Sequence, residues 1–381
     1  MKRQQRPSVF LYGAWKQNLG DDLFLKIISE RYPNCVFHIL TKREHKSAYS
    51  NMTNVIVHTK DAPTTRILNT LFRIGNSPEY VFKKMSRVAQ AIVFLGGSLY
   101  QQEKNWKRLY KQRVSLTYLF HDSFAIGNNF GPYSDPDFYN SYKIFFQRMN
   151  DVCFRDHTSK NLFPYPNVRV ASDVVFGLKN HCKYMDEIPL SECPKERYVV
   201  ISVINLNLES VSRKFNTVNA ETYEMWIEKL VAHLEERGYA VVLMGFCEAE
   251  KDGEAIDRII SDVHSAKTIK FIHNDIDSSL AIIKGADMVV ATRFHAMILG
   301  WIFDKRVLPI VYGSKMKHVI EDVGFDGCRI DIERIESYDP DRVLEDSKAL
   351  NNVSWFSRDA SKQFQGFDQW LECFENKTIL Q

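Results

Sequence analysis

The sequence lacks any long uninterrupted apolar run, and this excludes an ordinary helical membrane protein. No stretch of its 381 residues approaches the roughly 18 apolar residues that a membrane-spanning helix needs. The first residues, Met1-Lys-Arg-Gln-Gln-Arg-Pro, lead into a strand-like run rather than into the apolar core of a signal peptide. We therefore expect a soluble, globular protein that stays in the cytoplasm.

The cysteine and histidine spacings of a zinc site or a disulfide framework are also missing. The seven cysteines, at positions 35, 153, 182, 193, 247, 328 and 373, are scattered, and no Cys-X-X-Cys pair occurs. We expect them to be reduced residues of the core. The formal net charge of +3 is small for this length, which argues against nucleic acid as a partner. An anion site must therefore be local.

Two common phosphate-binding fingerprints are absent as well. No Walker lysine follows the turn Gly96-Gly97-Ser98, and no complete Gly-X-Gly-X-X-Gly occurs. These absences argue against a kinase and against a dinucleotide-binding enzyme.

What the sequence does contain is a regular alternation of strand-like and helix-like segments. A helix is expected from Asp22 to about Tyr32-Pro33, and another from Glu221 to Arg237. Such alternation implies parallel sheets with helices on both faces. The expected fold is α/β, with two doubly wound, Rossmann-like domains facing a cleft. Strands are expected at 8–12, 36–40, 91–95, 168–171, 198–203, 240–245, 286–291 and 306–310.

The chain length suits two domains of about 180 residues each. A polar region with Pro189 and Pro194 separates the two halves of the pattern. We expect an N-terminal α/β domain over 1–185 and a C-terminal α/β domain over 198–381. The second domain is expected to include an amphipathic tail helix, 355–374, that packs on a domain surface.

The most informative segment runs from Ala286 to Ile298, where a buried strand stops at a helix. Thr292 is expected to cap that helix, whose free N–H groups favour an anion. Arg293 would donate two hydrogen bonds to a phosphate or carboxylate, and His295 would carry a proton, with its pKa lowered by the helix terminus. Alternatively, Arg293 is a solvated cap and His295 a hydrogen-bonded core histidine.

Two clusters at other expected strand ends could also bind a ligand. In the loop after the first strand, Asn18 and Gly20 could contact a ligand and Asp21 or Asp22 would cap the next helix, unless this is a plain loop. The backbone of Gly96, Gly97 and Ser98 could hold phosphate oxygens, or form a tight turn only.

Three charged residues complete the candidates. Arg155 is either a clamp for phosphate or carboxylate or the partner of Asp156 in a structural ion pair. Asp173 could orient a sugar hydroxyl, although capping is the commoner role for an aspartate at a strand end. Lys315 lies downstream of Arg293 and could approach the same site as a point charge.

Taken in order, these motifs resemble the polysaccharide pyruvyl transferase family. The resemblance runs from about residue 10 to residue 325, and its first and sixth motifs are the more specific. Where the family usually has leucine, this chain has Phe294, which leaves the pocket shape open. The motifs are Asn18-X-Gly20-Asp21, Phe94-Leu95-Gly96-Gly97-Ser98, Ile126-Gly127-Asn-Asn-Phe-Gly131-Pro132, Phe154-Arg155-Asp156-X-X-Ser159, Ala171-Ser172-Asp173, Arg293-Phe294-His295-Ala296 and Tyr312-X-X-Lys315.

The resemblance implies a GT-B-like fold and an enzyme that moves the pyruvate unit of phosphoenolpyruvate onto a sugar as a ketal. His295 would be the general acid/base, and Arg293, with Arg155 and Lys315, would hold the donor's two anionic groups. Asn18, Gly20, Asp21, Gly96, Gly97, Ser98 and Asp173 are further candidates for substrate binding. The N-terminal domain would take the acceptor and the C-terminal domain the donor. No metal and no cofactor are expected, since phosphoenolpyruvate is a substrate.

Two other functions remain open at this point. A nucleotide-sugar-dependent glycosyltransferase of the same fold would use Arg293 and Lys315 on a diphosphate, and a non-catalytic carbohydrate-binding or scaffold protein is a third hypothesis. The expected acceptor is a sugar of a surface polysaccharide, either exopolysaccharide or capsule, or a lipid-linked precursor. A basic face next to aromatic residues could bring the protein to the inner face of the membrane, unless it is a solvated helix face. That face comprises Lys104, Lys107, Arg108, Lys111 and Arg113.

Overall fold

The computed structural model describes residues 6–74, 79–181, 188, 193–208 and 219–379. The chain forms two compact units. The first unit comprises residues 1–15, 24–182 and 357–381, and the second comprises residues 16–23 and 183–356. Helices α1 (Leu19–Arg31) and α15 (Val353–Ala360) each belong in part to both units. Most of the expected linker between the domains, and Cys182, lie outside the described residues.

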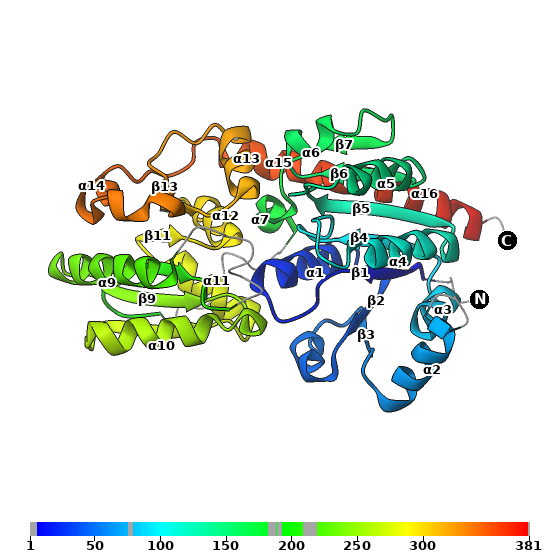
Figure 1. The fold of residues 1–381 in the computed structure, drawn as a ribbon. Coiled ribbons are helices and arrows are strands. Elements are labelled where there is room, and N and C mark those ends of the chain that lie inside the picture. The colour runs from blue at the N-terminus through cyan, green and yellow to red at the C-terminus, as the bar shows by residue number, and fades with distance from the viewer. Residues whose placement is uncertain (1–5, 75–78, 182–187, 189–192, 209–218, 380–381) are drawn as a thin grey trace. The chain divides into compact units, whose positions relative to one another are not determined.

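The first unit contains a seven-stranded parallel sheet in the order β3-β2-β1-β4-β5-β6-β7 (Figure 1). Its strands are β1 (Ser8–Tyr12), β2 (Val36–Thr41), β3 (Val55–Thr59), β4 (Ala91–Leu95), β5 (Asp122–Asn128), β6 (Asp151–Phe154) and β7 (Val168–Val170). Its helices include α2 (Pro63–Ile74), α3 (Tyr80–Val88), α4 (Trp106–Leu119), α5 (Pro136–Gln147), α6 (His157–Asn161), α7 (Leu178–His181) and α16 (Gln365–Ile379), with short 3-10 helices η3 (Val174–Gly177) and η7 (Ser361–Phe364).

The second unit contains a six-stranded parallel sheet in the order β10-β9-β8-β11-β12-β13. Its strands are β8 (Tyr198–Val203), β9 (Ala240–Gly245), β10 (Thr268–Ile272), β11 (Met288–Ala291), β12 (Arg306–Val311) and β13 (Ile330–Asp331). Its helices include α9 (Ala220–Glu236), α10 (Asp252–Val263), α11 (Ile276–Gly285), α12 (Phe294–Ile302), α13 (Ser314–Asp322) and α14 (Pro340–Glu345), with short 3-10 helices η5 (Glu248–Glu250) and η6 (Ile332–Ser337). Both sheets are doubly wound, as the alternation predicted.

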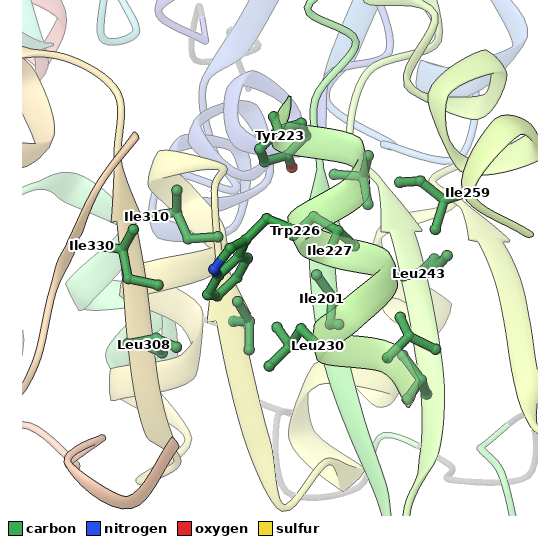
Figure 2. Packing of buried hydrophobic residues seen from close by; sticks show 14 of the residues in the cluster. Ile201, Tyr223, Trp226, Ile227, Leu230, Leu243, Ile259, Leu308, Ile310 and Ile330 are labelled. Atoms are coloured by element: carbon green, nitrogen blue, oxygen red, sulfur yellow. The ribbon is translucent and has the colours of Figure 1, made fainter. Parts of the chain in front are cut away.

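The core of the second unit forms where the apolar stripe of α9 meets the sheet. Figure 2 shows Trp226, Ile227 and Leu230 of α9 packed over Ile201 of β8 and Leu243 of β9. These side chains are at most 4% exposed, and full burial of one such side chain stabilises the fold by about 1.5–3 kcal/mol. The 3.6-residue spacing in the sequence therefore identified this face of α9 correctly.

The C-terminal tail belongs to the first unit, which corrects its assignment to the C-terminal domain. It is also interrupted, since α15 and α16 are joined by the 3-10 helix η7. Phe364 and Phe367 are fully buried, and Gln363 donates to the carbonyls of Phe154 and Ala171 and accepts from the N–H of Gly127. The tail packs on the first unit because these bonds complete the carboxyl ends of β5, β6 and β7.

The structure also tests the expectations about the basic face, the cysteines and membrane-spanning helices. Arg113 is only 5% exposed and donates to the hydroxyl of Tyr142, so it does not belong to the expected basic face. Cys373 is exposed, so the expectation that the cysteines are core residues is wrong for it; the six described cysteines are free thiols. Among the described residues, no helix is long and apolar enough to cross a membrane.

Candidate active site

The segment at the end of β11 is buried and leads directly into α12. The backbone N–H groups of Thr292 and Arg293 both donate to the hydroxyl of Ser202, each at 2.9 Å. The hydroxyl of Thr292 contacts that of Tyr223 at 3.1 Å, and Arg293 occupies the N-cap position without a side-chain capping bond. Thr292 is therefore not the cap that the sequence predicted.

His295 lies in the first turn of α12 and is partly exposed, with its Nε2 atom buried. Residues 291–300 are all described, and His295 is the one residue among them that is not classed as buried. Its ring packs directly against Gly20, because a β-carbon at position 20 would collide with the ring. Gly20 is thus required by close approach of another side chain. This contact joins the two most specific motifs of the sequence within the second unit.

The first turn of α1 is held in place by backbone contacts to the end of β9. The N–H of Leu19 donates to the carbonyl of Phe246 at 3.0 Å, and Asn18 forms an antiparallel bridge with Cys247. The side-chain oxygen of Asn18 accepts the N–H of Gly20 at 3.0 Å. Asn18 therefore caps α1, and the prediction that Asp21 or Asp22 does so is wrong. Asp21 lies in the same first turn, partly exposed.

A buried histidine fastens the same turn to the end of β10. His273 Nε2 lies 3.0 Å from the carboxylate of Asp22, and His273 Nδ1 lies 2.8 Å from the hydroxyl of Ser279. Ser279 donates its own proton to the carbonyl of Asp275 at 2.7 Å, so it must accept from Nδ1–H. His273 Nδ1 therefore donates to Ser279, and Nε2 faces the carboxylate of Asp22 at ion-pair distance.

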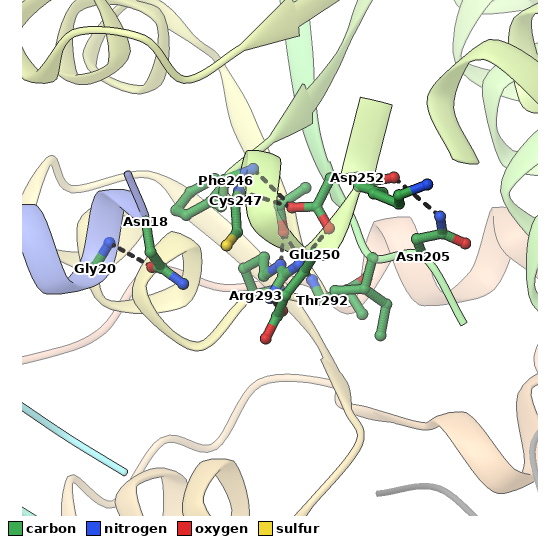
Figure 3. A network of polar contacts seen from close by, with 12 residues as sticks. Asn18, Gly20, Asn205, Phe246, Cys247, Glu250, Asp252, Thr292 and Arg293 are labelled. Carbon is green, nitrogen blue, oxygen red and sulfur yellow. Dashed lines mark hydrogen bonds and ion pairs between the residues drawn. The ribbon is translucent and has the colours of Figure 1, made fainter. Parts of the chain in front are cut away.

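Arg293 is buried in an ion-pair network rather than solvated. One guanidinium nitrogen binds the carboxylate of Glu250 and the other binds that of Asp252 (Figure 3). Asp252 also accepts the N–H groups of Phe246 and Cys247 at 2.9 and 3.0 Å. Burial lowers the pKa of Arg293, but Asp252 and Glu250 raise it well above its usual value. The solvated-cap alternative for Arg293 is therefore wrong.

Lys315 approaches the same helix start from α13. Its ammonium lies 5.8 Å from the ring centre of Phe294 and 5.2 Å from that of Tyr312. Helix α13 follows β12, the neighbour of β11 in the sheet, and its N-cap Gly313 makes no side-chain capping bond. Helices α12 and α13, whose N-cap residues make no side-chain capping bond, therefore follow adjacent strands of the second unit, and α13 carries the ammonium of Lys315.

The other predicted residues form a separate cluster in the first unit. Arg155 donates to the carboxylate of Asp173 at 2.9 Å and to the side-chain oxygen of Asn129 at 2.7 Å. Burial raises the pKa of Asp173, and Arg155 opposes this rise. The ion-pair alternative for Arg155 named Asp156, but Asp156 instead caps α6 by accepting from Ser159. Asp173 also caps η3 by accepting the N–H of Val175 at 2.9 Å.

The glycine turn after β4 packs against this arginine. A β-carbon at Gly97 would meet the guanidinium of Arg155, and Gly96 has φ +115°, which other residues rarely adopt. The carbonyl of Gly96 accepts from the side chain of Asn128, and Ser98 follows at a partly exposed position. The glycine at position 97 therefore leaves room for the guanidinium of Arg155. That the backbone of this turn binds phosphate stays a prediction.

The structure thus divides the predicted site residues between the two units. Asn18, Gly20, Asp21, Arg293, His295 and Lys315 lie in the second unit, and Gly96, Gly97, Ser98, Arg155 and Asp173 lie in the first. Sequence reasoning missed Asp252, Glu250 and His273. The only signal for them was position, since Glu248, Glu250 and Asp252 follow β9 and His273 follows β10.

Solved structures with similar folds define the class of this protein. HepE of Anabaena in complex with UDP and glucose aligns with a TM-score of 0.56 at 10% identity, over 97% of this chain and 100% of that one. The UDP-GlcNAc 2-epimerase of Methanocaldococcus jannaschii, in complex with UDP-GlcNAc and UDP, aligns with a TM-score of 0.56 at 10% identity, over 93% and 98% of the two chains. At such identities the likeness shows the fold alone. The fold is of the GT-B type, as expected.

The sequence motifs narrow this class to one family. The polysaccharide pyruvyl transferase family matches residues 18–314, a range that contains both Asn18-X-Gly20 and Arg293-X-His295. The chain belongs to this family. It is also 19% identical over 282 residues to the amylovoran biosynthesis protein AmsJ of Erwinia amylovora, which covers 68% of this chain. The matched part spans 66% of the length of AmsJ.

Proposed function

We propose that the protein transfers the pyruvyl unit of phosphoenolpyruvate to a sugar of a surface polysaccharide or its precursor, forming a ketal and releasing phosphate. One observation carries this proposal: His295 of the Arg-X-His motif packs on Gly20 of the Asn-X-Gly-Asp motif. Family membership and the position of His295 in the first turn of α12 support it. Phosphoenolpyruvate is the donor substrate, and no cofactor enters the proposed reaction.

The donor's two anionic groups match the positive groups around the start of α12. The positive dipole ends of α12 and α13 favour a phosphate or carboxylate, and Lys315 adds a full positive charge. Arg293 is already paired with two carboxylates, so a donor anion would compete with them for its positive charge. Glu250 is the partner that exchanges, because its side chain is 26% exposed whereas that of Asp252 is 1% exposed.

His295 performs the proton transfers in this proposal. Addition of the sugar hydroxyl to the enol carbon bearing the phosphate requires a proton on the terminal carbon and loss of one from the hydroxyl. A histidine beside the helix terminus supplies general acid/base catalysis worth about 10² to 10⁴ in rate. The tetrahedral ketal phosphate then loses phosphate, and a second hydroxyl closes the cyclic ketal. The groups that hold the phosphate stabilise it as it leaves.

Ligand-induced stabilisation distinguishes this proposal from a nucleotide-sugar glycosyltransferase. A ligand at a hundred times its Kd adds about 2.7 kcal/mol to the free energy of unfolding. Thermal unfolding should therefore move to a higher temperature with phosphoenolpyruvate and stay unchanged with UDP-glucose or a GDP-sugar. The opposite pattern would assign Arg293 and Lys315 to a diphosphate and reject the pyruvyl donor.

A further inference from the structure

A pocket of about 530 Å³ opens in the first unit at the carboxyl ends of its central strands. Tyr12 and Gly13 line it from the end of β1, Leu40 from β2 and Lys60 from the residue after β3. One wall is α4, which follows β4 on the other side of β1. The pocket therefore lies where the connections of the sheet change direction, the usual ligand position in doubly wound folds. Its volume suits a small saccharide.

The pocket is lined on one side by aromatic rings held in fixed positions. Trp15 is 3% exposed and donates its indole N–H to the carbonyl of Leu11 at 3.2 Å. Tyr12 lies between Phe82, at 6.4 Å between ring centres, and Phe94, at 5.2 Å. Tyr12 is the partly exposed ring among these, and its fixed position lets it contact the apolar face of a sugar.

The opposite wall is a polar and basic face of α4. Arg108, Lys111, Gln112 and Ser115 line the pocket at positions three, four and seven residues apart, which is one face of the helix. Arg108 and Lys111 are exposed. These two side chains therefore place positive charge at the rim of the pocket, where it would favour an anionic group. Lys60 adds a third cation, and among the described residues that line the pocket Glu79 is the acidic one.

A buried arginine adds positive charge behind the aromatic side. Arg113 donates to the hydroxyl of Tyr142, and its guanidinium lies 5.5 Å from the ring centre of Tyr100. Burial lowers the pKa of Arg113, but Tyr142, Tyr12 and Tyr100 keep it above its usual value. Tyr12 lines the pocket and interacts electrostatically with Arg113, so this buried charge adds to the attraction for an anion.

We propose that this pocket binds a saccharide that carries an anionic group, either a phosphate or a carboxylate. The aromatic rings would hold the sugar, and Arg108 and Lys111 would bind the anion. That the bound saccharide is the acceptor rests on the proposed pyruvyl transfer. That the pocket binds an anionic saccharide does not depend on that reaction. It also gives Arg108 and Lys111 a role other than contact with a membrane surface.

Calorimetric titration of the full chain tests the proposal with four probes: galactose 1-phosphate, galacturonic acid, galactose and inorganic phosphate. The two charged sugars should bind at least tenfold more tightly than galactose or inorganic phosphate, and added salt should weaken them. The double variant Arg108→Gln/Lys111→Gln should lose at least tenfold in affinity for both. Ser115→Trp, which fills the pocket without changing charge, should also abolish binding. Inorganic phosphate binding as tightly as galactose 1-phosphate would overturn the assignment to a saccharide.

The matched control is Lys104→Gln/Lys107→Gln, which removes the same charge from exposed neighbours that do not line the pocket. This variant should bind the charged sugars as the unchanged protein does. Equal loss of sugar affinity in both double variants would overturn the proposal. Binding to anionic phosphatidylglycerol vesicles is measured for the same variants. If Arg108→Gln/Lys111→Gln loses vesicle binding but keeps its affinity for the charged sugars, the proposal is also overturned. Stabilisation by phosphoenolpyruvate is measured in parallel and should persist in every variant. Its absence from the unchanged protein rejects the pyruvyl donor while the sugar titration still decides the pocket.

Discussion

His295 and Arg293 lie two residues apart, and the structure gives them different surroundings. His295 is partly exposed against Gly20, whereas Arg293 is buried between two carboxylates. His295→Ala should lower turnover by about 10² to 10⁴ and leave phosphoenolpyruvate-induced stabilisation nearly unchanged, because it removes a proton carrier and no charge that holds the donor. Steady-state phosphate release and thermal unfolding measure the two effects. Near-normal turnover in this variant would reject the assignment.

Glu250 is the residue whose removal should improve donor binding. It competes with the donor for Arg293 in the proposed exchange, so Glu250→Gln should tighten phosphoenolpyruvate binding by about three- to tenfold, up to about 1.4 kcal/mol. Glu248→Gln is the control, because Glu248 lies exposed on the same 3-10 helix. Unchanged donor affinity in the Glu250 variant, or equal tightening in both, would show that Arg293 is a structural arginine.

His38 gives the first unit a specific sensitivity to acid. Ser8 donates to the carbonyl of Val88 and accepts from His38 Nε2, so His38 Nδ1 accepts from His58. Burial, together with His58, lowers the pKa of His38 to about 4. A lowered folded-state pKa means that the unfolded chain binds the proton first, so stability is present above about pH 6.5 and is lost as the pH falls towards 4.

Replacing His38 should therefore remove part of this acid sensitivity. In His38→Leu, the decrease in the free energy of unfolding between pH 6.5 and 4 should be smaller by on the order of 1 to 2 kcal/mol, allowing for solvent screening. The variant should be less stable at pH 7 because it breaks the hydrogen-bond chain. Urea unfolding across this pH range measures both effects. His264→Asn, at an exposed histidine, should keep the original slope.

At the scale of elements, the first turn of α1 is fixed by its contacts with β9, β10 and α12. Gly20→Ala should destabilise the fold and reduce turnover, because the new β-carbon collides with His295. In a His295→Ala background the same substitution should cost much less stability, since the colliding ring is gone. This double-mutant cycle is measured by denaturant unfolding. Additive losses would mean that Gly20 and His295 do not constrain each other.

The Asp22–His273 pair is the second constraint on this turn. His273→Ala should cost about 3 kcal/mol or more, because it leaves the Asp22 carboxylate buried without its partner. Asp22→Asn added to that variant should recover part of the loss, since it removes the uncompensated charge. Urea unfolding of the single and double variants gives the comparison. A double variant that is less stable by the sum of both single losses would contradict the pairing.

At the scale of the whole molecule, the sequence predicted most of the central strands but missed β3, β5, β6, β10 and β13. Strands β1, β4, β8, β9 and β11 are short apolar runs because helices cover both sides of the sheet. The edge strand β10 is partly exposed and contains Lys270, so its apolar pattern is broken. The C-terminal tail was assigned to the wrong domain because its partners lie about 200 residues earlier, and no local pattern records such contacts.

The candidate site, like the fold, could be predicted from the sequence only in part. Arg293-X-His295 and Asn18-X-Gly20 could be found because family motifs and strand-to-helix turns mark them. Asp252, Glu250 and His273 could not, because their roles depend on which strand ends lie side by side in the folded sheet. For the same reason the partner of Arg155 is Asp173, which follows β7, the strand next to β6, and not its neighbour in sequence.

Direct detection of the product tests the central proposal most sharply. The purified chain is mixed with phosphoenolpyruvate and a galactose- or mannose-type acceptor, and phosphorus and carbon NMR follow inorganic phosphate and the ketal carbon. We predict that phosphate is released only when the acceptor is present, that a pyruvate ketal appears in equal amount, and that a chelator leaves the rate unchanged. Sugar transfer from UDP-glucose, with no phosphate released from phosphoenolpyruvate, would contradict the proposal.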